Sequence, residues 1–335
     1  MRTAREMARV VVVTGASAGV GRAVVRQLAR RGDALGLLAR GVDGLEAARA
    51  EVEALGGRAL VVPTDVADAE AVEAAAARVE AQLGPIDVWI NNAMATILAP
   101  VLEITPAEYR RVTEVTYLGA VHGTLSALRR MKPRDRGHII QVGSALAYRA
   151  IPLQAPYCAA KHALRGFTDA LRSELTHDRS AVLLGMVHLP GLNTPQFEWG
   201  RTRLPNQPQP VPPIFQPEVA ARAIADVIGQ NRREIYVGGS TVKTVIGAKL
   251  LPAFLDWYLA RKAYGGQQTD QPLRPDRADN LFRPVPSDFG ARGPFDERAK
   301  SRSLQAWVST HRGWLAAASA ASVAVTAGAV RALSR

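Results

Sequence analysis

The chain of 335 residues has few of the side chains that form disulfides, metal centres or nucleic-acid surfaces. Its single cysteine, Cys158, excludes an intrachain disulfide and a cysteine-based metal site. Its six histidines are scattered without a pair at ligand spacing, so we expect no metal. Aromatic residues are 6% of the chain and are not interleaved with its basic runs, so we expect no nucleic-acid partner. We expect the net charge of +12 to be mostly solvated surface, and the alternative is that it favours anionic phosphates or an anionic membrane surface.

Long apolar runs are also scarce. The run near the N-terminus is too short for a signal peptide or a spanning helix, which predicts a cytoplasmic protein. Near the C-terminus, the uncharged stretch Trp314–Val330 reaches only the lower limit of a spanning helix, about 17–25 residues. Its Ala-rich composition is weakly hydrophobic. We expect a helix within residues 311–335 that either anchors at a membrane or packs on another subunit.

Apolar residues make up 47% of the chain and follow an alternation of strands and helices. Short apolar runs predict strands at 10–13, 34–39, 58–63, 86–90, 137–142, 182–187 and 234–237. Amphipathic spacing predicts helices at 22–31, 45–55, 68–83, 105–131, 155–175 and 217–229. Such alternation implies right-handed crossovers and a doubly wound parallel α/β sheet of about seven strands. Ligands of these sheets bind outside the carboxyl ends of the strands.

A glycine loop connects the first predicted strand to the first helix. It carries Gly15, Gly19 and Gly21 in the spacing GxxxGxG, with Ser17 and Val20 between them. Glycines allow a tight turn and a close approach of the backbone, and the helix N-terminus offers N–H groups to a pyrophosphate. The order strand, glycine loop, helix therefore predicts a dinucleotide site.

Arg40 follows the second strand, where such folds meet the adenosine ribose. An acidic residue there holds a free 2′-hydroxyl, whereas an arginine suits a 2′-phosphate. We therefore expect NADP(H) rather than NAD(H), with a surface arginine as the alternative. After the third strand, Asp65 and Val66 either contact the adenine, or Asp65 caps the helix that begins near Asp68.

Tyr157 and Lys161 lie four residues apart on a predicted helix, so phenol and ammonium share one face. A free phenol has a pKa of about 10, and a neighbouring ammonium favours the phenolate and lowers that pKa. Ser144 ends the fifth strand and adds a hydroxyl for the same reacting oxygen. The alternative for Tyr157 and Lys161 is an ordinary pair on a half-exposed helix.

Taken together, Thr14–Gly21 as TGxxxGxG, Asn91-Asn92-Ala93, Ser144 and Tyr157-xxx-Lys161 resemble the short-chain dehydrogenase/reductase family over residues 8–240. The resemblance implies a Rossmann-like domain at 1–240, with Tyr157 as proton donor or acceptor, assisted by Lys161 and Ser144. It also implies that cofactor contacts continue beyond the glycine loop. These further cofactor residues are Asn92, Ala93, Tyr157, Lys161, Pro190, Gly191 and Thr194.

Two positions depart from the family pattern. Met94 stands where the family has a glycine, and it places a side chain beside the nicotinamide region. Thr116 stands where the family typically has an asparagine that joins a proton relay to the lysine, so Thr116 is a possible relay residue.

Beyond the core domain, residues 190–217 are rich in proline and predict a lid over the substrate. An aromatic-rich helical segment at 241–264 resembles the part of hydroxysteroid-type members that covers the pocket, forms dimers or enters a membrane. Residues 265–310 predict an extended Pro/Gly-rich linker.

These features predict an NADP(H)-dependent oxidoreductase that interconverts an alcohol and a ketone or aldehyde on a hydrophobic substrate. By resemblance we expect a homo-oligomer, either a dimer or a tetramer. Because of Met94 and Thr116, the alternative is an NADP-binding sensor or scaffold with little catalysis.

Overall fold

A seven-stranded parallel sheet forms the centre of the protein. The computed structural model describes residues 8–310, so the helix expected within 311–335 lies outside the described residues. The strand order is β10-β7-β6-β4-β1-β2-β3, and every pair is parallel. The strands are β1 (Val10–Thr14), β2 (Ala34–Ala39), β3 (Arg58–Pro63), β4 (Ile86–Asn91), β6 (His138–Ser144), β7 (Leu183–Leu189) and β10 (Glu234–Tyr236). The predicted fold class, a doubly wound parallel α/β sheet, is confirmed. Strands such as β1 are buried along their whole length, because their apolar runs have no polar face to expose to solvent.

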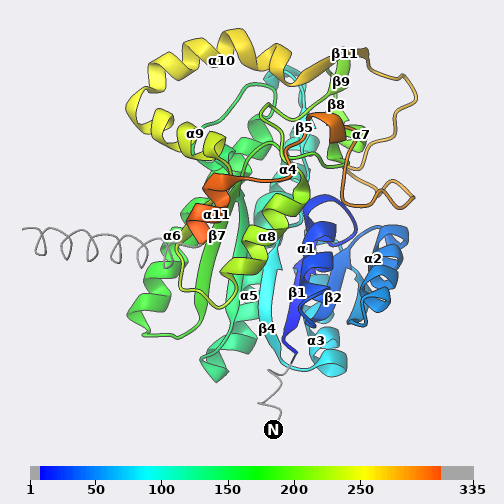
Figure 1. The fold of residues 1–335 in the computed structure, drawn as a ribbon, viewed down its shortest axis with the longest axis vertical. Coiled ribbons are helices and arrows are strands. Elements are labelled where there is room, and N and C mark those ends of the chain that lie inside the picture. The colour runs from blue at the N-terminus through cyan, green and yellow to red at the C-terminus, as the bar shows by residue number, and fades with distance from the viewer. Residues whose placement is uncertain (1–7, 311–335) are drawn as a thin grey trace, which may run out of the picture.

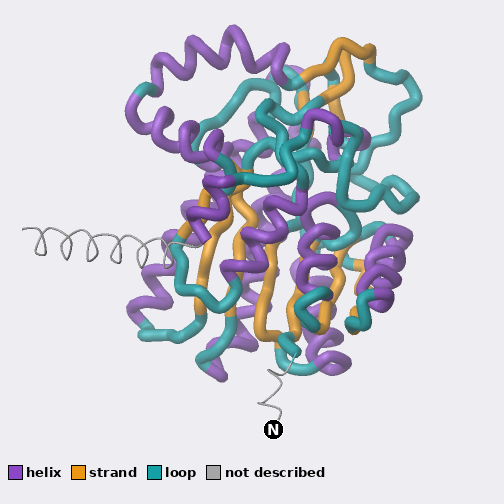
Figure 2. The backbone as a smooth tube through the Cα atoms, viewed as in Figure 1, coloured by secondary structure: helices purple, strands orange, loops and turns teal. Residues whose placement is uncertain are grey.

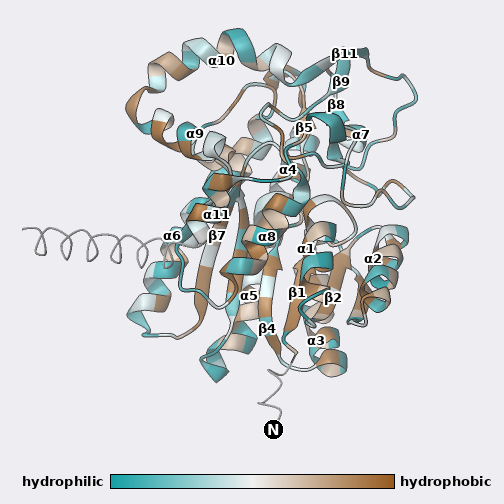
Figure 3. Cartoon of the chain, viewed as in Figure 1, coloured by the Kyte–Doolittle hydropathy of each residue, from teal (hydrophilic) through white to brown (hydrophobic). Residues whose placement is uncertain are grey.

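Helices cover both faces of the sheet and give three layers (Figure 1). One face packs against α1 (Gly19–Ala29), α2 (Val42–Ala54) and α8 (Pro217–Val227). The other packs against α3 (Ala69–Leu83), α4 (Pro106–Thr113), α5 (Gly119–Met131) and α6 (Ala155–His177). Each face therefore has its own apolar core, and Figure 3 shows the strands between them as mostly hydrophobic.

The strand order reverses between β1 and β4, the two central neighbours. Parallel strands place all their carboxyl ends at one edge, where the connecting loops gather in the upper half of Figure 2. At the reversal the loops leave in opposite directions and open a crevice, which is where such sheets bind ligands. The glycine loop after β1 and Asn92 after β4 both lie at this point.

The single helix expected over 105–131 is divided. Thr105 caps α4 through a reciprocal capping box with Glu108. The π-helical turn η2 (Glu114–Leu118) then joins α4 to α5 and holds Thr116. Spacing of apolar residues does not separate an α-helical turn from a π turn, so the sequence could not indicate this change.

The aromatic segment expected at 241–264 also consists of two helices. α9 (Gly239–Leu250) and α10 (Pro252–Gly266) meet at Leu251, because Pro252 cannot continue a helix from α9. Their outer faces expose large apolar side chains, among them Leu250, which is 71% exposed. Contact of this face with a second subunit or a membrane stays a prediction. Within residues 8–310, we find no helix with the length and apolar character needed to cross a bilayer.

The segment predicted as a linker is packed onto the body of the protein. Its strand β11 (Gln268–Pro272) pairs antiparallel with β9 (Asn206–Pro208), and a second small sheet joins β5 (Ile97–Leu98) to β8 (Arg201–Thr202). After β11 the chain runs down past α7 (Gln196–Trp199) toward α1 and α2, then returns to α11 (Leu304–Thr310), as the orange stretch of Figure 1 shows. Leu281, with no exposed surface, fixes this stretch to the core.

Close packing of α5 on β4 gives a test of the fold. A Cβ on Gly123 would lie 2.3 Å from Asn91 Oδ1 and 2.5 Å from Trp89 Nε1. These two atoms form a hydrogen bond that the added Cβ would disturb. We expect Gly123→Ala to lower the free energy of unfolding by about 1–3 kcal/mol. Gly166→Ala in α6 is the matched control, because open space surrounds that position and the change should stabilise by up to ~1 kcal/mol. Urea unfolding measures both, and equal effects would contradict this packing.

Candidate functional site

A cavity of about 530 Å³ lies at the carboxyl ends of the strands, over the reversal between β1 and β4. A volume of this size is typical of small-molecule and cofactor sites. Of the residues predicted for a site, only Gly21 and Thr116 do not line it. The predicted residues that line it are Gly15, Ser17, Gly19, Val20, Arg40, Asp65, Val66, Asn92, Ala93, Ser144, Tyr157, Lys161, Pro190, Gly191 and Thr194.

The glycine loop lies against the end of β4 with no room for side chains. Gly15 has a φ of +68°, and a Cβ there would lie 2.9 Å from the Cα of Ala93. A Cβ on Gly21 would lie 2.0 Å from the carbonyl oxygen of Gly15. Gly21 is therefore needed for the turn itself, although it does not face the cavity.

Thr14 and Asn92 hold this close approach in place. The Thr14 hydroxyl accepts hydrogen bonds from the backbone N–H groups of Asn92 and Ala93, at 2.9 and 3.0 Å. The Asn92 amide donates to the carbonyl of Thr14 at 2.9 Å. These bonds connect the loop of one strand to the end of its neighbour, so the floor of the cavity is fixed by backbone geometry.

Ser144, Tyr157 and Lys161 meet at one side of the cavity. Ser144 ends β6 and caps the following turn, and its side chain is hydrogen-bonded to the Tyr157 hydroxyl. One turn along α6 from Tyr157, Lys161 is buried and its Nζ donates to the carbonyl of Val142 at 2.7 Å. This Nζ lies 5.7 Å from the centre of the Tyr157 ring. The alternative of a pair on a half-exposed helix face does not describe this geometry, since Lys161 is 3% exposed.

Burial controls the protonation of both groups. Burial raises the pKa of Tyr157, and the hydrogen bond with Ser144 opposes that rise. Burial lowers the pKa of Lys161 to about 8. At neutral pH the protein therefore holds a neutral phenol beside a charged ammonium. The sequence predicts that the Lys161 ammonium lowers the pKa of Tyr157. In the structure, burial raises this pKa by more than neighbouring groups lower it.

Thr116 is engaged with the backbone. Its hydroxyl donates to the carbonyl of Ala95 and accepts from the N–H of Ala95, both at 2.9 Å. A hydroxyl has one proton to donate, so Thr116 directs it at Ala95 rather than toward Lys161. A relay role for Thr116 stays a prediction.

Arg40 and Asp65 lie at the opposite end of the cavity. The guanidinium of Arg40 donates to the carbonyls of Asn280, Leu281 and Phe282. Burial and the nearby Arg111 both lower the pKa of Arg40, so this end favours an additional anion. Asp65 pairs with Arg111, and Asp68 is the residue that caps α3.

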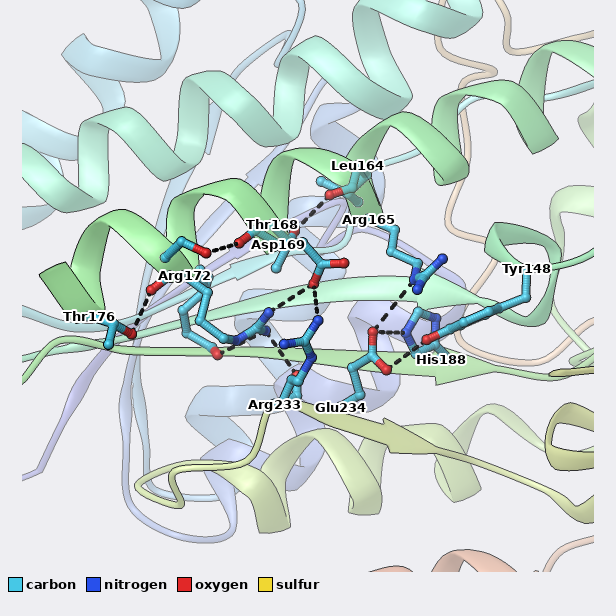
Figure 4. A network of polar contacts seen from close by, with 12 residues as sticks. Tyr148, Leu164, Arg165, Thr168, Asp169, Arg172, Thr176, His188, Arg233 and Glu234 are labelled. Carbon is cyan, nitrogen blue, oxygen red and sulfur yellow. Dashed lines mark hydrogen bonds and ion pairs between the residues drawn. The ribbon is translucent and has the colours of Figure 1, made fainter. Parts of the chain in front are cut away.

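Figure 4 shows a polar network that includes Tyr148, His188 and Glu234, and His188 of this network contacts the backbone of Ser144. The ring of the fully buried His188 lies between the carbonyl of Ser144, 3.2 Å from its Nδ1, and the carboxylate of Glu234, 3.5 Å from its Nε2. That carboxylate accepts hydrogen bonds from Tyr148 and Tyr236, both at 2.6 Å. Burial alone would raise the pKa of Glu234, but these hydrogen bonds outweigh burial and hold it well below its usual range. Sequence reasoning assigned His188 no role, because nothing local links it to Glu234.

Two further groups of residues line the cavity, and of these only Met94 is singled out by the sequence pattern. Apolar side chains from several segments line the side near Tyr157: Met94, Leu146, Ile151, Leu192, Phe197, Val211, Leu255, Tyr258 and Leu259. Residues of the supposed linker line the side near Arg40: Asn280, Pro284, Val285, Ser287 and Phe289. The cavity is therefore lined both by apolar side chains and by polar and backbone groups. Within residues 8–310, we find no cluster of histidine, cysteine or acidic residues that could hold a metal.

Known proteins are similar to this chain in sequence. A family model described as short chain dehydrogenase matches residues 9–200. The uncharacterized oxidoreductase YxnA of Bacillus subtilis is 29% identical over 276 residues, which cover 82% of this chain and 78% of that protein.

Solved structures are similar as well. An alcohol dehydrogenase from the archaeon Thermococcus sibiricus, complexed with 5-hydroxy-NADP, has a TM-score of 0.61 at 27% identity and covers 68% of this chain and 95% of its own. A metagenomic short-chain oxidoreductase in complex with NADP has a TM-score of 0.58 at 28% identity, and it covers 68% of this chain and 96% of its own. The span matched by the family model, residues 9–200, contains the glycine loop, Ser144, Tyr157 and Lys161.

Proposed function

Because this chain belongs to the short-chain dehydrogenase/reductase family, we propose that it is an NADP(H)-dependent oxidoreductase that interconverts an alcohol and a ketone or aldehyde. One observation carries the proposal. A single cavity joins the glycine loop to Ser144, Tyr157 and Lys161, so a dinucleotide and a substrate oxygen can be held side by side.

The residues present fit a dinucleotide. The close approach of Gly15 to Ala93 and of Gly21 to Gly15 brings the N-terminus of α1 to the cavity, where backbone N–H groups suit a pyrophosphate. Arg40 suits a 2′-phosphate, and Lys161 would hold the ribose hydroxyls. When bound, the nicotinamide supplies or accepts a hydride at its C4.

Tyr157 and Ser144 act on the substrate oxygen. In the direction of reduction, the neutral phenol of Tyr157 donates its proton to the oxygen as negative charge develops there. The Ser144 hydroxyl donates a second hydrogen bond to that oxygen and orients it. The buried ammonium of Lys161 stabilises the phenolate that remains, which would otherwise be costly in this desolvated site. His188 and Glu234 keep the end of β6 in position.

The substrate is hydrophobic in this proposal. Support comes from the apolar side chains that line the cavity. Helix α10 contributes Leu255 and Leu259, and the proposed lid at 190–217 contributes Phe197 and Val211. Met94 adds to this apolar surface and narrows the space near the reacting carbon. Steroid, lipid or terpenoid carbonyl compounds have the required size and polarity.

Removal of the phenolic hydroxyl tests the proposal. We expect Tyr157→Phe to lose about 10²–10⁴-fold in turnover, because the proton donor is gone, while NADPH binding stays close to wild type. The matched control is Tyr117→Phe, since Tyr117 packs on Phe167 away from the cavity. Initial rates against a panel of apolar ketones and alcohols measure turnover, and NADPH fluorescence measures binding. Wild-type turnover in Tyr157→Phe would refute the assignment, and binding without turnover in the wild type would favour a sensor.

Cofactor preference depends on Arg40. We expect the wild type to bind NADPH more tightly than NADH, and Arg40→Ala to reduce the affinity ratio about tenfold or more, because a charge-assisted hydrogen bond to the 2′-phosphate is lost. The readout is the ratio of the NADPH affinity to the NADH affinity. Loss of the hydrogen bonds from Arg40 to the carbonyls of residues 280–282 affects the binding of both cofactors equally, so it cancels in this ratio. Arg30→Ala is the control, because Arg30 is exposed at the end of α1. Equal affinities in the wild type would contradict the role of Arg40.

A further inference from the structure

Residues 277–290 run across one side of the cavity and are named the strap. The strap begins beside α7, where the guanidinium of Arg277 donates to the carbonyls of Gly200 and Phe197. Two residues further on, the carboxylate of Asp279 pairs with Arg201 at 2.9 Å. The start of the strap is therefore tied to the proposed substrate lid.

The middle of the strap is held by two arginines of the body. Three successive carbonyls, those of residues 280–282, accept hydrogen bonds from Arg40. The carbonyl of Leu281 also accepts from Nε of Arg111 at 3.1 Å. A guanidinium has five N–H donors, so Arg40 keeps donors for a ligand while it holds the strap.

The end of the strap reaches the glycine loop. The carbonyl of Gly290 accepts from the N–H of Gly19 at 3.0 Å. Asp288 pairs with Arg22 at 3.1 Å, and the ring of Phe289 meets Trp199 edge-on at 4.2 Å between centroids. The strap thus spans from the lid to the loop that would hold the pyrophosphate.

The inner side of the strap forms a wall of the cavity through Pro284, Val285 and Ser287. Arg40 and Gly19, which hold the strap by hydrogen bonds, line the same cavity, so the strap covers the part of it in which an adenosine would lie in the proposed site. Most of its attachments are hydrogen bonds and ion pairs near the surface, and the one strap side chain in the apolar core is Leu281. Segments attached in this way open locally at far lower cost than the core.

We propose that the strap is a cover that opens to admit and release the dinucleotide, and that the hydrogen bonds from Arg40 hold it closed. The inference rests on the proposed dinucleotide site. Its consequence is that the rates of dinucleotide association and dissociation are set by opening of residues 277–290 rather than by contacts of the dinucleotide alone.

A reversible crosslink tests the cover. A Cβ on Gly41 would lie 3.5 Å from Cβ of Pro284, within the range of about 3.5–4.5 Å that a disulfide spans. The double variant Gly41→Cys/Pro284→Cys joins the strap to the body, and the native Cys158 is buried and does not interfere. Mass spectrometry establishes the disulfide, and stopped-flow fluorescence of NADPH gives both rate constants for the oxidised and the reduced protein.

We expect both rate constants to fall tenfold or more on oxidation and to recover on reduction. In a second variant, Asp279→Ala, loss of the Arg201 pair should raise the dissociation rate at least threefold. The matched control is Asp276→Ala, since Asp276 is exposed on the same segment. Equal rates for the oxidised and reduced protein, or an unchanged dissociation rate in Asp279→Ala, would overturn the cover while leaving the dinucleotide site intact. A wild type that binds neither NADPH nor NADH would refute the site and the cover together.

Discussion

The site depends on the close approach of two backbones at the reversal of strand order. Gly15 lies against Ala93 and Gly21 lies against Gly15, at separations that leave no space for a Cβ. Hydrogen bonds of Thr14 with Asn92 and Ala93 hold this approach without any charged side chain. The fixed glycine loop lines one cavity, which reaches Arg40 at one end and Ser144 and Tyr157 at the other.

Burial gives the two ends their different chemistry. Near Tyr157, desolvation keeps the phenol neutral and brings the pKa of Lys161 to about 8, so a proton can be donated next to a cation that stabilises its loss. Near Arg40, two arginines face one carboxylate, Asp65, and the surplus positive charge suits a phosphate. The strap closes the second end, and the apolar helix α10 lines the first. In the proposed function, chemistry and cofactor exchange are therefore controlled by different segments.

The sequence predicted what depends on local pattern. The strands, the glycine loop and the pair Tyr157–Lys161 are each recognisable within a few residues, and the parallel topology then brings them to one edge. The strap was missed because its partners are distant: about 240 positions separate Arg40 from the carbonyls it binds. Composition also misled, because polar and proline-rich residues predict an extended linker, whereas one buried leucine and backbone carbonyls hold the segment in place. The π turn at Thr116 and the His188–Glu234 contact likewise arise only from packing.

The most direct measurement is transfer of a labelled hydride. The enzyme is mixed with NADPH carrying deuterium at both hydrogen positions of the nicotinamide C4, and with a panel of apolar ketones, in a single turnover. We expect an alcohol product with one deuterium on the carbinol carbon, formed in step with NADP⁺ and about 10²–10⁴-fold more slowly in Tyr157→Phe. NADPH that binds and remains unoxidised with every ketone, or an alcohol without deuterium, would contradict a hydride transfer at Ser144, Tyr157 and Lys161.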